Sequence, residues 1–528
     1  MTAFDGVMRR AGGVVLLACL AGSVAAARAA VPAAVSACAP RAIGALHVAD
    51  VTVAEASAQG AACVVTGRIR THGAGAPDGS AGFRLSLPRA WNARFLMLGV
   101  GGFAGNMTPS ANGRDIAEAA ADGYAVGITD TGHADAPGTA LVDGRFALDA
   151  DGHPDRARLA DYDWRATHQA TSALKALVAR YYGARIDHAY FDGCSNGGRQ
   201  GMIEAERFPG DYDGIIAGDP FLTLRLMLGD IKVQQANLAA PDGRLRPSDL
   251  ALIDRFTLSA CDALDGRADG LIQNPALCHP DFDRLLCRPG QTSACLAPAQ
   301  VRTARAFVAD TTDRRGGRVY PGFAVGHWGA GLAAAMQFGM QEAGPPAGAT
   351  WPDHAGPMEY QFDDQALKYL VMRDPSFSLL RYPVGPSGIV PDAALAAYDG
   401  AVRDGNADDA GKMAAFLKKG GKIIFYHGYA DMAISPYSTI DFFNALQAAA
   451  PDAARGARLF MVPGMAHCGG GVGPDRFDTL SPLDRWVATG QAPARIEGAP
   501  SAASGHAMPL CAYPAQARAG ARQAWACR

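Results

Sequence analysis

The glycine-rich stretch Gly193-Cys194-Ser195-Asn196-Gly197 constrains the fold of this chain more than any other feature. It follows an apolar segment, 188–191, that is typical of a buried strand end, and it precedes a predicted helix over 199–207. A Gly-x-Ser-x-Gly sequence between a strand and a helix lets the chain turn sharply and exposes the serine oxygen near a helix N-terminus. Because the chain has 63 glycines, a plain turn with a surface serine is the alternative. The flanking elements favour a nucleophile elbow.

Predicted strands and helices alternate around this turn. Strands are expected at 83–87, 94–98, 124–130, 421–428 and 457–462, and helical periodicity runs from Asp163 to Tyr182. Strand, helix, strand, elbow and helix in succession predict an α/β fold with a mostly parallel, doubly wound sheet.

The segment 221–405 differs in character from the rest of the chain. It is richer in Pro, Gly, Asp and aromatic residues, holds four of the cysteines and lacks the strand–helix alternation. We therefore predict a core in two parts, 30–220 and 406–528, with 221–405 inserted as a lid domain. About 500 mature residues are more than one ordinary domain needs, which agrees with a large insertion.

Residues 1–29 have the pattern of a secretory signal peptide. Arg9 and Arg10 precede an uncharged stretch over 11–27, and Ala27-Arg28-Ala29 supplies a small-residue cleavage site. The apolar run is too short for a comfortable membrane span, so we expect an exported protein, secreted or periplasmic, with no membrane span. The paired arginines raise twin-arginine export as an alternative.

The composition excludes some classes of partner. The chain is 49% hydrophobic and 19% charged, with a net charge of −3. Without a basic stripe or tail there is little electrostatic attraction to phosphate backbones, so no nucleic-acid partner is expected. A small-molecule partner is expected instead, and the oligomeric state is not predicted.

The cysteine count predicts disulfides. Cys19 lies in the predicted signal peptide, which leaves ten of the 11 cysteines, and an even number in an exported chain implies disulfide bonds. The sequence alone does not fix their connectivity. Pairing neighbours along the chain gives Cys38 with Cys63, Cys261 with Cys278, Cys287 with Cys295, and Cys511 with Cys527, while Cys194 and Cys468 remain.

Two polar residues complete a candidate catalytic triad with Ser195. Asp431 follows the predicted strand at 421–428, and His467 follows the one at 457–462. Serine, aspartate and histidine in this order, each beyond the carboxyl end of a strand, are typical of a hydrolase. His467 would take the serine proton, and Asp431 would fix the imidazole tautomer and stabilise its cation. His427 and His133 are rival bases, and Asp130 is a rival acid that breaks the order.

A glycine cluster over 99–105 follows the predicted strand at 94–98. Such a loop lets backbone N–H groups approach a developing oxyanion without side chains intervening, although a plain tight turn would look the same in sequence.

The pairs Cys194-Ser195 and His467-Cys468, together with Asp431, resemble the CS-D-HC signature of the tannase and feruloyl esterase family, which includes bacterial mono(hydroxyethyl) terephthalate hydrolase. The resemblance covers nearly the whole mature chain. It implies an α/β-hydrolase fold with a lid, a serine carboxylic ester hydrolase acting on aromatic acid esters, and a disulfide between Cys194 and Cys468. It also implies Gly102 and Asn196 as oxyanion donors, with Gly101 a close rival of Gly102.

The segment 261–271 carries carboxylates three and four residues apart among glycines. Hard oxygen ligands at short spacing suit Ca²⁺, but the segment departs from the EF-hand pattern, so spacing alone favours an acidic surface loop. The family resemblance reverses this preference. It implies structural calcium held by the side chains of Asp262, Asp265 and Asp269 and by the backbone carbonyls of Arg267 and Leu271.

The predicted lid is rich in aromatic residues, and aromatics at such density are usually core. Of Tyr320, Phe323, His327, Trp328, Phe338, Trp351, Tyr360 and Phe362, we expect Trp328 and Phe338 to line an aromatic acyl pocket. No Lys or Arg lies between Arg318 and Lys368, whereas a free terephthalate carboxylate would require a cation. A feruloyl esterase or tannase-like activity is therefore favoured. The alternatives are a terephthalate half-ester hydrolase whose cation comes from elsewhere in the fold, and a catalytically inactive binding protein, which the intact triad disfavours.

Overall fold

The computed structural model describes residues 38–528, except for 113, 137–138, 140, 331, 504 and 520–524. The predicted signal peptide lies outside the described residues. Within them, no helix is long and apolar enough to cross a membrane.

A nine-stranded sheet is the centre of the fold, in the order β1-β2-β3-β5-β4-β6-β7-β11-β12. Its strands are β1 (Val51–Gln59), β2 (Ala62–Thr71), β3 (Gly79–Pro88), β4 (Arg94–Leu98), β5 (Ala125–Thr129), β6 (His188–Cys194), β7 (Gly214–Gly218), β11 (Lys422–Gly428) and β12 (Ala457–Val462). From β5 to β12 all neighbours are parallel, whereas β1, β2 and β3 form an antiparallel extension. The parallel strands are buried runs because helices cover both faces.

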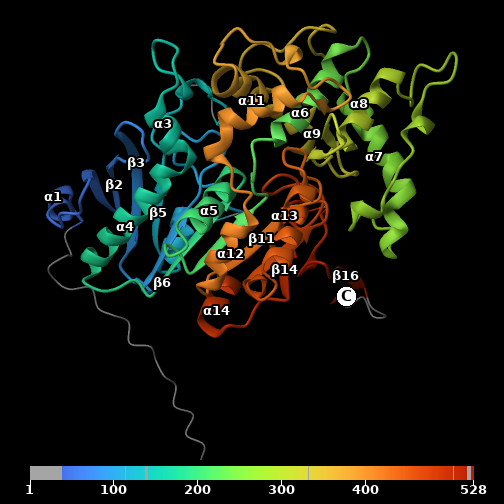
Figure 1. The fold of residues 1–528 in the computed structure, drawn as a ribbon. Helices are drawn as coiled ribbons and strands as arrows, with labels where there is room; N and C mark the ends of the chain where they lie inside the picture. Colours follow the sequence, from blue (N-terminus) through green and yellow to red (C-terminus); the bar gives the residue numbers. More distant parts are fainter. Residues whose placement is uncertain are drawn as a thin grey trace, which may run out of the picture.

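The helices form two layers on this sheet (Figure 1). One layer consists of α4 (Ala166–Tyr182), α5 (Asn196–Arg207), α12 (Ala410–Lys418) and α13 (Pro436–Ala449), whose apolar residues pack with β4, β6 and β11. The other includes α2 (Ile116–Ala121) and α14 (Leu480–Thr489). This arrangement confirms the predicted doubly wound α/β architecture.

The segment from α6 to α11, inserted between β7 and β11, lies beside the core and is called the lid below; it is coloured green to orange in Figure 1. Its helices are α6 (Leu226–Ala239), α7 (Pro247–Cys261), α8 (Pro298–Val308), α9 (Leu332–Gln337), α10 (Met358–Gln365) and α11 (Asp392–Val402), and a small sheet joins β8 (Thr311–Asp313), β9 (Arg318–Tyr320) and β10 (Ile389–Val390). Because β7 and β11 are parallel neighbours, with Ile216 opposite Ile424, the insertion leaves the core sheet continuous.

The shorter elements lie outside these layers. They are α1 (Pro40–Gly44), α3 (Arg156–Ala160), the sheet of β13 (Arg476–Phe477), β14 (Arg495–Ala499) and β15 (Met508–Cys511), and the pair β16 (Ala517–Ala519) and β17 (Trp525–Cys527).

Five disulfides join the described residues. They are Cys38–Cys63, Cys194–Cys468, Cys261–Cys278, Cys287–Cys295 and Cys511–Cys527. Four of these close short segments, whereas Cys194–Cys468 spans 274 residues and ties the elbow to the loop after β12.

Candidate active site

Ser195 lies at the turn between β6 and α5, with φ 62° and ψ −127°. A non-glycine residue with positive φ is strained, and this strain is typical of a nucleophile elbow. The turn also needs close backbone contact, because a Cβ on Gly193 would lie 2.5 Å from the Gly197 carbonyl carbon, and one on Gly99 would lie 2.6 Å from the Gly197 Cα. The glycines are therefore required by packing on both sides of the serine.

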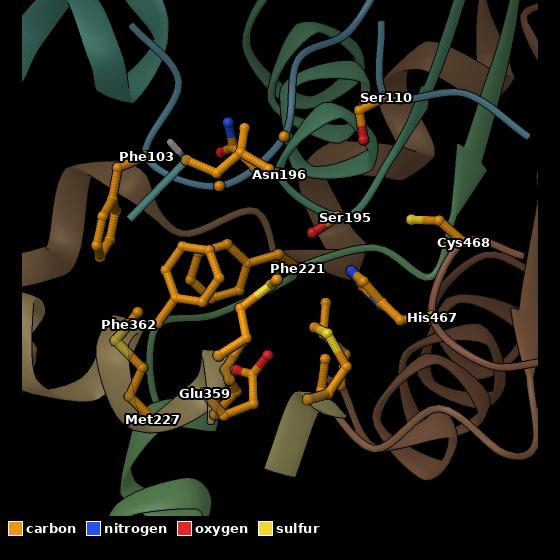
Figure 2. Close-up of a pocket in the computed structure, with 18 residues that line it drawn as sticks. Phe103, Ser110, Ser195, Asn196, Phe221, Met227, Glu359, Phe362, His467 and Cys468 are labelled. Atoms are coloured by element: carbon orange, nitrogen blue, oxygen red, sulfur yellow. The ribbon is translucent and has the colours of Figure 1, made fainter. Parts of the chain in front are cut away.

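His467 and Asp431 reach this turn from the loops after β12 and β11. The Nδ1 atom of His467 lies 2.7 Å from Oδ2 of Asp431. Figure 2 shows Ser195 and the His467 ring at the same cavity, with the Ser195 hydroxyl turned into the cavity. The described residues contain no direct Ser195–His467 hydrogen bond, and in substrate-free hydrolases this contact commonly tightens only in the complex.

The surroundings of Asp431 keep it ionised. Its Oδ1 accepts hydrogen bonds from the backbone N–H groups of Ala433 and Ile434, at 2.8 and 2.9 Å. Burial opposes ionisation of this carboxyl, but the adjacent imidazoles of His467 and His427 outweigh burial and hold its pKa below the ordinary value. Burial alone would lower the pKa of His467. The negative charges of Asp431 and Asp219 outweigh burial, so the pKa of His467 lies above its ordinary value. The pair is arranged to stabilise an imidazolium.

The rival residues occupy other environments. His427 lies 3.3 Å from Asp431, but its ring is fully buried and bonds Thr439 and the Ile434 carbonyl, so it does not line the cavity. His133 stacks on Phe146. Asp130 accepts hydrogen bonds from the backbone of Gly82 and Gly132. Neither His133 nor Asp130 belongs to the constellation around Ser195.

Gly102 and Asn196 both line the cavity next to Ser195. The Asn196 side chain is turned into the protein, where Nδ2 donates to the Val100 carbonyl at 3.0 Å and Oδ1 accepts from Arg199 at 2.8 Å. Only its backbone N–H, in the first turn of α5, is left for an oxyanion. Gly102 has φ 56°, and a Cβ there would lie 2.4 Å from the Leu141 carbonyl oxygen. Gly101 lines the cavity as well.

Asp219 is a buried residue of this site that the sequence analysis did not single out. It follows β7, and its two oxygens accept hydrogen bonds from the backbone N–H groups of Gly428 and Cys468, both at 2.7 Å. It therefore links the loops that carry Asp431 and His467. Its position after a parallel strand, like that of Asp431, was a signal that could have identified it.

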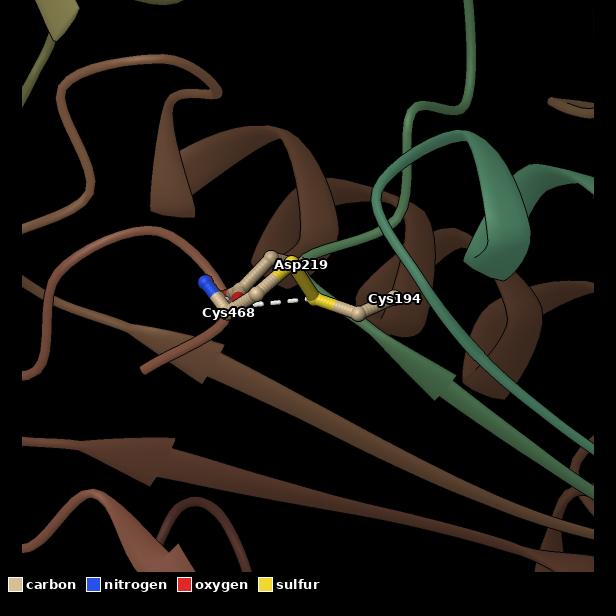
Figure 3. Close-up of side chains that lie close together, drawn as sticks. All are labelled: Cys194, Asp219 and Cys468. Atoms are coloured by element: carbon tan, nitrogen blue, oxygen red, sulfur yellow. Dashed lines mark hydrogen bonds between the residues drawn. A yellow bond between two sulfur atoms is a disulfide. The ribbon is translucent and has the colours of Figure 1, made fainter. Parts of the chain in front are cut away.

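The carboxylate of Asp219 also lies against the Cys194–Cys468 disulfide (Figure 3). Its Oδ2 is 3.3 Å from the Cys194 sulfur. Because a disulfide sulfur carries no proton, this contact is not a hydrogen bond, and the two N–H donors satisfy the carboxylate instead. Burial raises the pKa of Asp219 to about 6, against the opposing effect of His427.

The cavity in front of Ser195 has a volume of about 150 Å³ and a mostly apolar lining. The core contributes Phe103 and Ile434, and the lid contributes Phe221, Leu226, Met227, Met336, Met358, Glu359 and Phe362. Among the described residues that line it there is no lysine or arginine. Glu359 was not anticipated, because nothing in its local sequence marks it.

The expectation for Trp328 and Phe338 is wrong. Both are buried in the lid's own hydrophobic core, where they pack against Phe307, and neither lines the cavity. Phe362, from the same group of lid aromatics, contacts the cavity and packs edge-on against Phe103.

The predicted calcium ligands lie in one loop, where each of the three carboxylates already has a protein partner. Asp262 accepts from the N–H of Gly270 at 3.0 Å, Asp265 accepts from the N–H of Arg267 at 2.9 Å, and Asp269 pairs with the Arg267 side chain at 3.2 Å. The three carboxylates are not among the described clusters whose ligand atoms all lie within 4.8 Å of one another. Asp269 Oδ1 is nevertheless buried and has no hydrogen-bond partner among the described residues, as expected of an oxygen that binds a cation. Leu271 is buried and lines the same small pocket as Asp269.

Comparisons with known proteins agree with this geometry. The family model described as tannase and feruloyl esterase matches residues 63–526. Mono(2-hydroxyethyl) terephthalate hydrolase from Piscinibacter sakaiensis is 34% identical over 83% of this chain and 78% of its own. Feruloyl esterase C from Talaromyces stipitatus is 29% identical over 81% of this chain and 78% of its own.

Among solved structures, feruloyl esterase B from Aspergillus oryzae superimposes with a TM-score of 0.76 at 23% identity, covering 92% of this chain and 98% of its own. This likeness confirms the α/β-hydrolase fold. The chain therefore belongs to the tannase and feruloyl esterase family and is a carboxylic ester hydrolase.

Proposed function

We propose that this protein is an exported serine esterase that hydrolyses esters of neutral aromatic acids through an acyl-enzyme. The observation that carries the proposal is that the strained Ser195 and the hydrogen-bonded pair of His467 and Asp431 meet at one mostly apolar cavity. Export is supported by the five disulfides, which persist in oxidising compartments.

The chemistry follows from the positions of these groups. Ser195 Oγ attacks the ester carbonyl while His467 takes its proton, and the negative charge develops on the carbonyl oxygen beside the N–H groups of Gly102 and Asn196. His467 then gives the proton to the departing alkoxide, which leaves as the alcohol. Water then attacks the acyl carbon while His467 takes its proton, and the bond to Ser195 Oγ breaks as His467 returns that proton to Oγ, which releases the acid.

The size and lining of the cavity indicate the substrate class. A mostly apolar cavity of about 150 Å³ is large enough for one benzene ring. Ring faces and edges pack well against Phe103, Phe221 and Phe362. Relatives named feruloyl esterases agree with an aromatic acyl group.

A hydrolysis panel tests the proposal. Methyl ferulate, methyl gallate, mono(hydroxyethyl) terephthalate and p-nitrophenyl acetate are compared for kcat/KM, with Ser195→Ala as the control. We expect turnover of methyl ferulate or methyl gallate well above that of p-nitrophenyl acetate, and labelling of Ser195 by a fluorophosphonate. A wild-type protein that neither reacts with the label nor cleaves any ester would contradict it.

A terephthalate half-ester hydrolase is the second candidate, favoured by the 34% identical relative of that name. The absence of lysine and arginine among the described cavity residues opposes it. Half-ester turnover comparable to that of methyl ferulate would favour this candidate over the first.

We also propose a structural Ca²⁺ in the lid loop, held by Asp262, Asp265 and Asp269 and by the carbonyls of Arg267 and Leu271. The unpartnered buried oxygen of Asp269 supports it. A bound ion would neutralise the mutual repulsion that, together with burial, raises the pKa of Asp265.

A further inference from the structure

Glu359 is the one carboxyl among the described residues that line the cavity. It lies in the first turn of α10, is only 4% exposed, and is flanked by Met358 and Phe362 of the same helix. Figure 2 shows it across the cavity from Ser195, with its carboxyl group turned toward the space between them. No hydrogen bond to its carboxyl oxygens is present within the described part of the chain, so these atoms are left for a ligand.

The side chains behind Glu359 include two more carboxyls, and the nearby cation Lys232 acts on one of them, Asp230, without lining the cavity. Asp230 and Asp363 are both completely buried, and Asp363 has two carboxyl oxygens without a described partner. Asp230 receives one hydrogen bond, from Gln337 at 2.8 Å, and its other oxygen is unpartnered. Burying an ionised carboxylate without a partner costs much free energy, so the carboxyl groups of this cluster are favoured in their protonated, neutral form.

The protonation state of Glu359 follows from this setting. Burial, and then the charges of Asp230 and Asp431, hold its pKa well above the ordinary value. A neutral carboxylic acid has one O–H donor as well as acceptor oxygens, so it can bond a hydroxyl group as donor or as acceptor. A substrate carboxylate in the same place would meet an acidic cluster, and Lys232, the cation near Asp230, does not line the cavity.

We propose that Glu359 is the specificity-determining residue of this site, and that it hydrogen-bonds a phenolic hydroxyl on the far side of the acyl ring from the ester. The inference rests on the proposed function, because it assumes that the acyl ring occupies the cavity in front of Ser195. With the ester carbonyl at Ser195 and the ring beside Phe362, the distal substituent faces Glu359. A ring without that hydroxyl leaves the carboxyl desolvated and unpaired.

The test compares methyl p-coumarate with methyl cinnamate, which differ only in the ring hydroxyl. Wild-type kcat/KM is expected to favour methyl p-coumarate by about 10- to 100-fold, the usual effect of leaving one buried polar group unpaired. Glu359→Leu should bring this ratio close to one. Glu359→Gln, which is neutral and keeps both a donor and an acceptor, should retain most of it.

The melting temperature of each variant is measured alongside, because a merely structural role would change the melting temperature and leave the ratio unaltered. Equal turnover of the two esters by the wild type, or an unchanged ratio in Glu359→Leu, would overturn the proposal while leaving the esterase assignment standing. A wild type that cleaves neither ester would instead refute the proposed function.

Discussion

Removing the Cys194–Cys468 disulfide should lower stability and turnover together. The bond closes 274 residues of chain, whereas Cys511–Cys527 closes only 16. Loop-closure entropy assigns about 5.5 kcal/mol to the long loop and about 3 kcal/mol to the short one. At the unfolding entropy of about 2.1 cal/mol/K per residue, each kcal/mol shifts the melting temperature of a chain this long by about 1 °C. We expect losses of about 5 °C for C194A/C468A and about 3 °C for C511A/C527A.

The kinetic effect should separate the two variants more clearly. Cys194 precedes Ser195 and Cys468 follows His467, so the disulfide ties together the turns that carry the proposed nucleophile and base. A misplacement of about 1 Å costs roughly 100-fold in rate. Since Asp219 still binds the Cys468 backbone, we expect kcat for methyl ferulate to fall about 10- to 100-fold in C194A/C468A, with KM changed little. In C511A/C527A kcat should change by less than about 2-fold.

Calorimetry and steady-state kinetics, run well below both melting temperatures, measure these two effects. A C194A/C468A variant with full kcat, or one whose melting temperature falls no further than that of C511A/C527A, would show that the disulfide does not hold the catalytic residues in place.

The other predictions concern the triad, pH and calcium. Ser195→Ala and His467→Ala should each reduce kcat by about 10⁴-fold or more, and the double variant should lose little beyond either single one. Asp431→Asn should lower kcat, whereas Asp130→Asn should leave it nearly intact. If Asp130→Asn lowered kcat and Asp431→Asn did not, Asp130 would be the acid of the triad. The acid limb of kcat/KM should lie above the ordinary histidine pKa, because Asp431 and Asp219 raise that of His467, and Asp431→Asn should shift this limb to lower pH. The folded protein raises the pKa values of Glu359, Asp230 and Asp363, so these groups bind more protons in the folded state than in the unfolded state. Their contribution to the free energy of unfolding is therefore complete below about pH 4 and is lost as the pH rises through their folded pKa values. Between pH 5 and 8, the melting temperature of Glu359→Gln should fall less steeply than that of the wild type. Removing Ca²⁺ with a chelator should lower the melting temperature, because an ion that binds only the folded protein stabilises it by mass action. An unchanged melting temperature, with no calcium found by elemental analysis, would mean that the segment 261–271 is an acidic surface loop.

The sequence was most informative where buried parallel strands precede functional turns. The runs before Asp431 and His467 are continuous apolar stretches, because β11 and β12 are covered on both faces, and their predicted limits match the structure closely. The antiparallel strands β1 and β2 were not predicted, since β1 is largely exposed and lacks a buried run.

The lid was less predictable for a physical reason. Trp328 in the core and Phe362 at the cavity are both apolar aromatics, and only long-range packing decides which of them meets a substrate. Glu359 is recognisable only after α10 has been placed opposite Ser195, because a lone glutamate at a helix start normally faces water.

The adjacency of β7 and β11 makes the enzyme modular. Strand ends of the core carry Ser195, Asp431 and His467, whereas Met227, Met336, Glu359 and Phe362 come from the chain inserted between those two strands. Sequence drift in the insertion can therefore change which acid is accepted without disturbing proton transfer in the core. A chimaera that receives residues 221–405 from a relative should take on the substrate preference of the donor and keep the catalytic base of the recipient.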